Sequence, residues 1–178
     1  MRLFFASWPP RETAQALGRW ATEVCDESGG KLTVVENIHL TLAFLGEADR
    51  EKAAEAARRV AGRRHELPID AARYVKRNQM VWVGPDAMPP ELASLAADLR
   101  ASLVHGGFAL EERSFAAHVT LIRKARRPAS LPPLPRVAWP VDEFVLVSSK
   151  TASNGSTYEP LERFPLRLMQ DKSPLASG

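Results

Sequence analysis

A short pattern that occurs twice constrains this chain more than any other feature. It reads His39-Leu40-Thr41-Leu42 in the first half and His118-Val119-Thr120-Leu121 in the second. Polar and apolar residues alternate in both copies, which predicts a β-strand for each. Residues i and i+2 of a strand point to the same face, so each copy presents an imidazole beside a hydroxyl. Two such strands facing one cleft would surround a small anion and support acid–base chemistry on a phosphate.

The residues around the two copies repeat as well. Before each copy, an apolar strand leads to a proline pair, which opens a helical stretch that a glycine pair closes. His39 follows Pro10 at nearly the same spacing as His118 follows Pro90. An internal repeat of this length predicts two similar lobes related by an approximate two-fold axis. That symmetry would bring the two His-x-Thr strands together, whereas one copy alone would indicate little.

Hydrophobic periodicity predicts an α+β fold with antiparallel sheets and helices packed outside them. Helices are expected at residues 11–26, 49–60 and 91–104. Strands are expected at residues 3–7, 31–35, 38–45, 67–74, 80–83, 108–111, 118–124, 141–148 and 158–168. The proline-rich segment 126–135 should form an exposed loop, and Asn154-Gly155 favours a hairpin turn. We expect residues 1–168 to form a single bilobal domain and residues 169–178 a disordered tail.

Composition narrows the class of protein. The chain has 178 residues, of which 45% are hydrophobic, and this is enough for a substantial core. A net charge of +3 is compatible with an anionic partner. The single cysteine, Cys25, excludes an intramolecular disulfide framework and a cysteine-rich zinc site. The sequence has neither a signal-peptide pattern nor an apolar run near the roughly 18 residues of a membrane span, so we expect a soluble cytoplasmic protein.

Two imidazoles across one phosphate can divide the work of catalysis. Histidine has an unperturbed pKa of about 6.5 and can therefore act as base or acid near neutral pH. One ring takes a proton from the attacking oxygen, and the other gives a proton to the leaving oxygen. The threonine hydroxyls would donate to the non-bridging oxygens. This chemistry needs no metal or cofactor, and it suits a strained phosphodiester such as a 2′,3′-cyclic phosphate at an RNA end.

The sequence resembles the two-histidine (2H) phosphoesterase superfamily, and within it the bacterial RNA 2′,3′-cyclic phosphodiesterases, historically called 2′-5′ RNA ligases. The resemblance extends from about Arg2 to Leu166. It rests on the stretches Arg2-Leu3-Phe4-Phe5-Ala6, Glu36-Asn37-Ile38-His39-Leu40-Thr41-Leu42, Phe44-Leu45-Gly46, His118-Val119-Thr120-Leu121-Ile122-Arg123, Ser156-Thr157-Tyr158 and Phe164-Pro165-Leu166.

The resemblance implies a bilobal fold with sheets lining a central cleft, and hydrolysis of a terminal 2′,3′-cyclic phosphate to a 2′-phosphate. Reversible 2′-5′ ligation is an expected side activity. By this analogy His39 is the proton donor and His118 is the base that activates water. Thr41 and Thr120 would bind the phosphate. The expected partner is RNA with a cyclic phosphate end, such as a tRNA fragment or oligonucleotide, bound by a monomer without a cofactor.

Further residues are candidates for substrate binding. Strict alternation places Arg123 opposite the cleft, unless the strand bulges and its guanidinium reaches the phosphate. Phe44 could stack on a base, although periodicity favours a place in the core. Tyr158 is a further candidate. The sequence departs from the family pattern at Ala43, on the predicted cleft face, and at Ala117. The basic run from Arg123 to Arg127 could guide an RNA backbone or be surface charge alone.

Three other functions remain open from the sequence. A related 2H enzyme could act on cyclic nucleotides, ADP-ribose cyclic phosphate or 2′-5′ oligonucleotides with the same cleft chemistry. A non-catalytic module could bind RNA ends without needing two titrating groups. A metal hydrolase would use His39 and His118 as ligands, but the chain lacks a ligand cluster of standard spacing. The chain also has no nucleotide-triphosphate loop, so ATP-driven ligation has no support.

Overall fold

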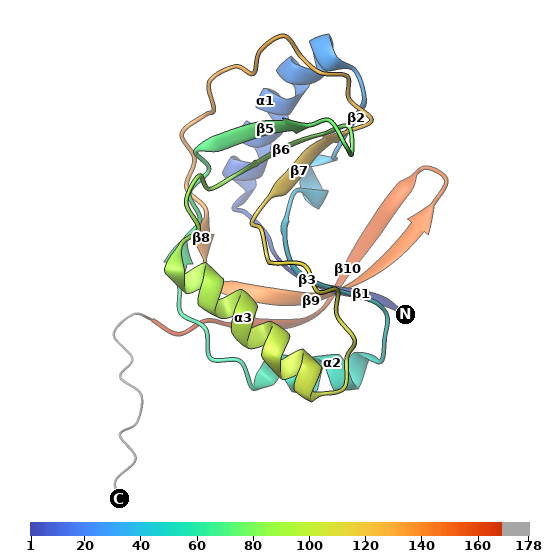
Figure 1. The fold of residues 1–178 in the computed structure, drawn as a ribbon, viewed down its shortest axis with the longest axis vertical. Coiled ribbons are helices and arrows are strands. Elements are labelled where there is room, and N and C mark those ends of the chain that lie inside the picture. The colour runs from blue at the N-terminus through green and yellow to red at the C-terminus, as the bar shows by residue number, and fades with distance from the viewer. Residues whose placement is uncertain (169–178) are drawn as a thin grey trace, which may run out of the picture.

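Two four-stranded antiparallel sheets form the framework of the computed structural model, which describes residues 1–168 (Figure 1). The first sheet has the strand order β10-β9-β1-β3, with β1 at Arg2–Ser7, β3 at Leu40–Glu47, β9 at Glu143–Ala152 and β10 at Gly155–Pro165. The second has the order β2-β7-β6-β5, with β2 at Lys31–Leu32, β5 at Ala71–Val75, β6 at Met80–Gly84 and β7 at Val119–Arg123. A two-stranded sheet joins β4, His65–Glu66, to β8, Pro140–Val141.

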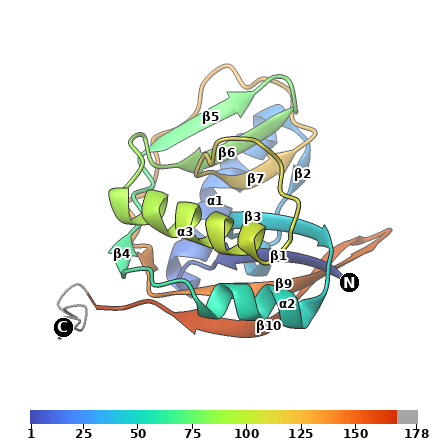
Figure 2. The ribbon, with the colours of Figure 1, turned by 60° about the horizontal axis from the view of Figure 1, so that its bottom comes forward.

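The two helices that follow proline pairs cross between the lobes. Helix α1, Arg11–Ser28, follows β1 of the first sheet but contacts β2 and β7 of the second. Helix α3, Pro90–His105, follows β6 of the second sheet but contacts β3 of the first and α2, Arg50–Arg58. Figure 2 shows α2 and α3 together along the first sheet and α1 with the second. Each of these two helices therefore packs on the sheet opposite to the one that contains the strand before it.

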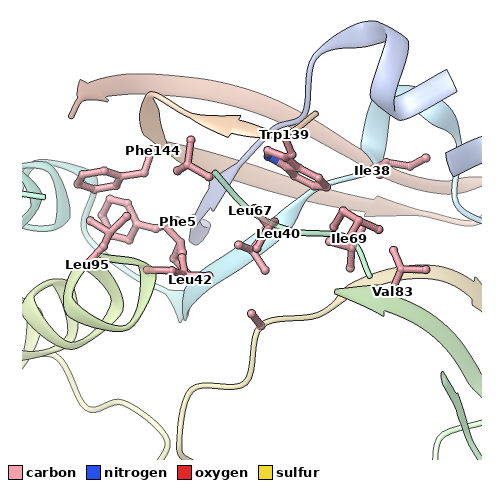
Figure 3. Packing of buried hydrophobic residues seen from close by; sticks show 14 of the residues in the cluster. Phe5, Ile38, Leu40, Leu42, Leu67, Ile69, Val83, Leu95, Trp139 and Phe144 are labelled. Atoms are coloured by element: carbon pink, nitrogen blue, oxygen red, sulfur yellow. The ribbon is translucent and has the colours of Figure 1, made fainter. Parts of the chain in front are cut away.

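One continuous core joins the lobes, because the buried cluster includes residues of both sheets and of all three helices. Figure 3 shows Trp139, which is fully buried, among side chains that include Ile38 and Leu67. The indole nitrogen of Trp139 donates a hydrogen bond to the Ser7 hydroxyl at 3.4 Å. This shared core fixes the position of one sheet relative to the other and hence the width of any cleft between them.

Most predicted elements are confirmed. All three helices lie where periodicity placed them, and the Asp49 carboxylate caps α2 by accepting from the Lys52 N–H at 2.9 Å. The hairpin turn predicted at Asn154-Gly155 joins β9 to β10. Both motif strands begin one residue after their histidine, so His39 and His118 stand at strand entrances. The predicted tail at 169–178 lies outside the described residues.

The structure corrects three of the predicted strands, of which one is absent and two are shorter than expected. The segment 108–111 forms no strand, because the Phe108 N–H closes the end of α3 by donating to the Leu103 carbonyl at 3.0 Å. The strand expected at 31–35 ends at Leu32, and the chain turns into a 3₁₀ helix, η1, at Val35–Asn37.

The strand expected at 67–74 is present only as β5, because the Leu67 N–H donates to the Trp139 carbonyl and thereby continues the pairing of β4 with β8 rather than joining the second sheet. The segment 126–135 is a loop, but it is not wholly exposed. Its Leu131 and Leu134 pack against the core, and the Pro132 carbonyl accepts from Trp20 Nε1 at 3.1 Å.

Candidate functional site

A cleft of about 440 Å³ contains both copies of the repeated motif. His39 and Thr41 reach it from the first sheet, and His118 and Thr120 reach it from the second. The predicted sharing of a face by each histidine and threonine is therefore confirmed in both lobes. The tip of the β9–β10 hairpin forms a further wall of the cleft. In Figure 1 this hairpin extends well beyond the body of the molecule.

The two histidines have the same backbone anchor. His39 Nδ1 lies 2.7 Å from the Asn37 carbonyl oxygen, and His118 Nδ1 lies 2.9 Å from that of Ala116. A carbonyl oxygen can only accept a hydrogen bond, so Nδ1 carries the proton in both rings. Each neutral ring is left with Nε2 as its basic nitrogen. In His39 this nitrogen lies 3.1 Å from Thr41 Oγ1, whose hydroxyl donates to it.

Aromatic rings enclose His39. Trp8 stacks on it with ring centroids 4.9 Å apart and an interplanar angle of 24°. Phe4 lies 5.2 Å away, and Tyr158 meets the imidazole edge-on at 5.3 Å. The resulting burial lowers the pKa of His39 below its ordinary value, the hydrogen bond to Asn37 acts in the opposite direction, and the positive charge of Arg123 adds to the lowering. The imidazole of His39 is therefore biased towards its neutral form.

His118 has a more open environment. Its side chain is exposed, and its one aromatic neighbour among the described residues is Trp82, with ring centroids 5.8 Å apart. The register of the second sheet places Trp82 directly opposite Thr120. The corresponding residue opposite Thr41 in the first sheet is Ala6. The two lobes thus repeat the His-x-Thr geometry but surround it with different side chains.

A β-bulge sets the position of Arg123. Val81 pairs with Ile122 and Trp82 pairs with Thr120, so Leu121 is an extra residue on β7. The bulge shifts the alternation by one position, which turns Ile122 into the core and Arg123 out to the cleft. Strict alternation, which placed Arg123 on the opposite face, was therefore wrong for this residue. The alternative of a bulged strand end is the arrangement that the structure has.

The first motif has a matching bulge, at Leu42, since Phe5 pairs with Ala43 and Ala6 pairs with Thr41. Two predictions fail for this reason. Ala43 packs against the core rather than facing the cleft. Phe44, expected in the core, is 51% exposed, and the Arg2 guanidinium lies 5.5 Å from its ring centroid. Phe44 occupies the place in its lobe that Arg123 occupies in the other, but it does not line the cleft.

Several residues of the site were missed by the sequence analysis. Trp8 follows the end of β1 and belongs to no periodic pattern, so nothing in the sequence pointed to it. Asn37 Nδ2 donates to the Ser156 carbonyl at 3.1 Å and thereby ties η1 to the hairpin. Lys31 lines the cleft from β2. The hairpin-turn signal at Asn154-Gly155 was visible in the sequence, but its place beside the cleft depends on tertiary packing.

The basic residues near the second motif do not all lie at the cleft. Of the run that begins at Arg123, only Arg123 itself lines the cleft. Arg127 lies over the Tyr74 ring at 5.7 Å on the far strand β5.

Within residues 1–168, no group of three or more His, Cys, Asp or Glu side chains is arranged to hold a metal ion. No helix in that part of the chain is long and apolar enough to cross a membrane.

This geometry offers two basic Nε2 atoms, the hydroxyls of the two motif threonines, one guanidinium and one ammonium group to a single cleft. Such a set can bind an anion and move protons at opposite sides of it. Tyr158, which the sequence indicated as a substrate-binding candidate, lines the same cleft.

Comparison with known proteins agrees with this arrangement. Relatives named RNA 2′,3′-cyclic phosphodiesterase occur in Escherichia coli strain K12, at 36% identity over 93% of this chain and 96% of the relative, and in Thermus thermophilus, at 34% identity over 94% and 91%. The crystal structure of Escherichia coli LigT with 3′-AMP superimposes with a TM-score of 0.85 at 34% identity, covering 93% of this chain and 97% of that one.

The predicted α+β fold and the internal repeat are thus confirmed. One family model matches the chain twice, over residues 8–82 and 83–158, and each match contains one His-x-Thr copy. The chain belongs to the family of LigT-like phosphoesterases.

Proposed function

We propose that this phosphoesterase hydrolyses the 2′,3′-cyclic phosphate at an RNA end to a 2′-phosphate. The observation that carries the proposal is that both histidines of the repeat line one cleft with Nδ1 held by a backbone carbonyl and Nε2 left basic. The names of the relatives, RNA 2′,3′-cyclic phosphodiesterase, support this substrate class. The same site would join RNA ends by a 2′-5′ bond when a 5′-hydroxyl takes the place of water, because its oxygen then bonds to phosphorus as the bond to the 3′-oxygen breaks and the two rings move the same protons.

In the proposed reaction, the phosphate lies between His39 and His118. His118, on the open side of the cleft, takes a proton from water through Nε2. The water oxygen bonds to phosphorus, and the bond from phosphorus to the 3′-oxygen breaks. His39 gives its Nε2 proton to that leaving oxygen, which becomes the 3′-hydroxyl. One proton is taken and one is given, so the pair of rings ends in exchanged protonation states and resets through solvent.

The other polar groups stabilise charge on the phosphate. Thr41 and Thr120 donate their hydroxyl hydrogens to the non-bridging oxygens, and Arg123 supplies a positive charge from the bulged end of β7. In the free cleft the Thr41 hydroxyl instead donates to His39 Nε2. A bound phosphate therefore releases that nitrogen from Thr41 and competes for the hydroxyl.

Substrate binding also prepares the acid. Burial lowers the pKa of His39, so the free ring is biased towards the neutral state, which cannot act as a proton donor from Nε2. A phosphate anion beside the ring favours the charged imidazolium and raises the pKa again. His39 thus becomes protonated, and able to donate, when the anion binds. We also propose that the enzyme acts as a monomer, because a single chain supplies both histidines.

The test is an assay with EDTA on an RNA oligonucleotide that ends in a 2′,3′-cyclic phosphate. Wild type should convert this end to a 2′-phosphate, and His39→Ala and His118→Ala should each lose about 10² or more in rate. His105→Ala, at an exposed position on α3, is the matched control and should keep full activity. Inactivity in EDTA that zinc or manganese restores would contradict the two-histidine mechanism. Tight, end-specific binding without turnover would indicate a binding module instead.

The same assay separates the related 2H reactions. Turnover of nucleoside cyclic phosphates or 2′-5′ oligonucleotides, with none of the RNA end, would replace the proposed substrate while keeping the cleft chemistry.

A further inference from the structure

A second hollow, of about 230 Å³, lies beside the catalytic cleft on the same face of the first sheet. We term it the Trp8 pocket. Its lining includes Trp8, Glu36, Val145, Val147, Tyr158 and Arg163. Tyr158 and Asn37 line both hollows, so they form the wall between them. Nothing in the proposed reaction uses this pocket.

The pocket is built for a flat apolar group. Val145 and Val147 of β9 are buried beneath it and belong to a small cluster with Phe4 and Ala6 of β1. Trp8 and Tyr158 stand against this cluster with ring centroids 6.4 Å apart. Nε1 of Trp8 donates to the Glu36 carbonyl at 2.9 Å, which fixes the indole plane. The volume lies below the roughly 300–1,000 Å³ of pockets for drug-sized ligands and suits a single heterocycle.

Charges at the rim select against a phosphate as the occupant. Glu36 is an exposed residue that lines the pocket, and its negative charge would repel an anion there. The Arg163 guanidinium is already bonded to the Glu143 carboxylate. What remains is an aromatic and aliphatic lining with a carboxylate at the rim, which can accept hydrogen bonds from the amino groups of a base. Aromatic side chains of this kind bind unstacked bases of single-stranded RNA.

The position of the pocket identifies which base it receives. Trp8 stacks on His39 and also lines the Trp8 pocket, so its indole ring lies between the catalytic imidazole and the pocket. The terminal ribose carries the cyclic phosphate and must lie in the cleft with it. A base in the Trp8 pocket, which lies one step away from the cleft, therefore belongs to the adjacent nucleotide, the one that precedes the terminal nucleotide. Resting on the function proposed above, we infer that the Trp8 pocket binds the base of the nucleotide preceding the terminal cyclic phosphate.

The experiment compares three substrates: a nucleoside 2′,3′-cyclic phosphate, a dinucleotide ending in the same group, and that dinucleotide with an abasic first residue. Wild type should show a kcat/KM about tenfold higher for the intact dinucleotide than for the abasic one, as expected for one stacked base. Val147→Phe fills the pocket and should reduce this ratio to near one. Its kcat/KM for the mononucleoside substrate should stay within about twofold of wild type.

Val147→Ala is the matched control, because it changes the same buried position without filling the pocket and should keep a clear preference for the intact dinucleotide. If Val147→Phe does not fold, Pro160→Trp blocks the pocket from an exposed rim position on β10. A wild-type ratio near one would overturn the inference. So would a folded Val147→Phe that loses activity equally on all three substrates, since that places the terminal base in the pocket.

Failure of the proposed function has a different signature, which is no turnover of any of the three substrates. In that event, calorimetric titration with the 2′-phosphorylated dinucleotide, intact and with an abasic first residue, still tests whether the Trp8 pocket binds the preceding base. Tighter binding of the intact than of the abasic ligand, lost in Val147→Phe, supports the pocket assignment. Equal binding of the two ligands overturns it.

Discussion

The indole ring of Trp8 stacks on the imidazole of His39, with centroids 4.9 Å apart. This contact supplies part of the burial that lowers the pKa of His39. Replacing Trp8 with Leu should admit water to the ring and raise its pKa towards the ordinary value of about 6.5. The measurement is an NMR titration of the His39 ring. Trp82→Leu, beside His118, should leave the His39 titration unchanged, and an unmoved His39 curve in Trp8→Leu would contradict the argument.

The lowered pKa of His39 should also appear in protein stability. The unfolded chain binds a proton on this residue at about pH 6.5, before the folded protein does. The free energy of unfolding should therefore fall as the pH drops below about 6.5, by up to about 1.4 kcal/mol per pH unit, until the folded pKa is reached. His39→Gln cannot titrate and should show a shallower slope between pH 7 and pH 5 in urea unfolding. Identical slopes in the two proteins would contradict this prediction.

The bulge at Leu121 brings Arg123 into the cleft, so its charge should matter to the reaction. Arg123→Met keeps an unbranched, flexible side chain and removes the charge. We expect kcat/KM for the cyclic phosphate end to fall by roughly 10², the cost typical of losing one group that stabilises transition-state charge. The control is Arg126→Met, which removes an exposed charge nearby that does not line the cleft. If both variants lose kcat/KM equally, Arg123 contributes only as one of several surface charges.

Much of the site was predictable because one sequence pattern, the alternation of polar and apolar residues, indicated both the strands and the polar residues that share a face. The period-two alternation that indicated the strands also placed His39 beside Thr41 and His118 beside Thr120, and the structure keeps both pairs. The repeat itself implied that the pairs would meet. Local sequence sufficed for these conclusions, because a side chain's face on a regular strand depends only on its position.

The errors arose where position alone does not decide the face. A bulge depends on the register of a strand with its partner, which the sequence of β7 or β3 does not reveal. Arg123, Ala43 and Phe44 were therefore placed on the wrong faces or left open, all for the same reason. Trp8 was missed because its role comes from a tertiary contact with His39. The crossing of α1 and α3 between lobes is likewise a property of packing, not of periodicity.

The two threonines should contribute separately from the histidines. Thr41→Val and Thr120→Val keep the shape of the side chain but remove the hydroxyl that would donate to the phosphate. Each should lower kcat by about 10²–10³, whereas Thr41→Ser and Thr120→Ser should retain most of the activity. Thr22→Val, on α1 and away from the cleft, serves as the control. If the valine variants match wild type in single-turnover rates, the hydroxyls do not contact the reacting phosphate.

The two glycine pairs of the repeat offer a final comparison. Gly30 and Gly107 both have positive φ angles, of 100° and 89°. A methyl group at Gly30 would lie 2.6 Å from the Arg123 carbonyl oxygen, but one at Gly107 would meet nothing within 4 Å. Both alanine variants bear the conformational cost of a positive φ, about 1–2 kcal/mol. Gly30→Ala must in addition push β7 away and displace Arg123.

We therefore expect Gly30→Ala to lower the free energy of unfolding by about 1–3 kcal/mol more than Gly107→Ala does, the range typical of overpacking. Urea unfolding of the two variants measures this difference. Folded Gly30→Ala should also lose activity on the cyclic phosphate end, because the strand that carries Arg123 and Thr120 has moved, while folded Gly107→Ala should not. Equal stability and equal activity in the two variants would show that the close approach of Gly30 to β7 does not hold the second motif in place.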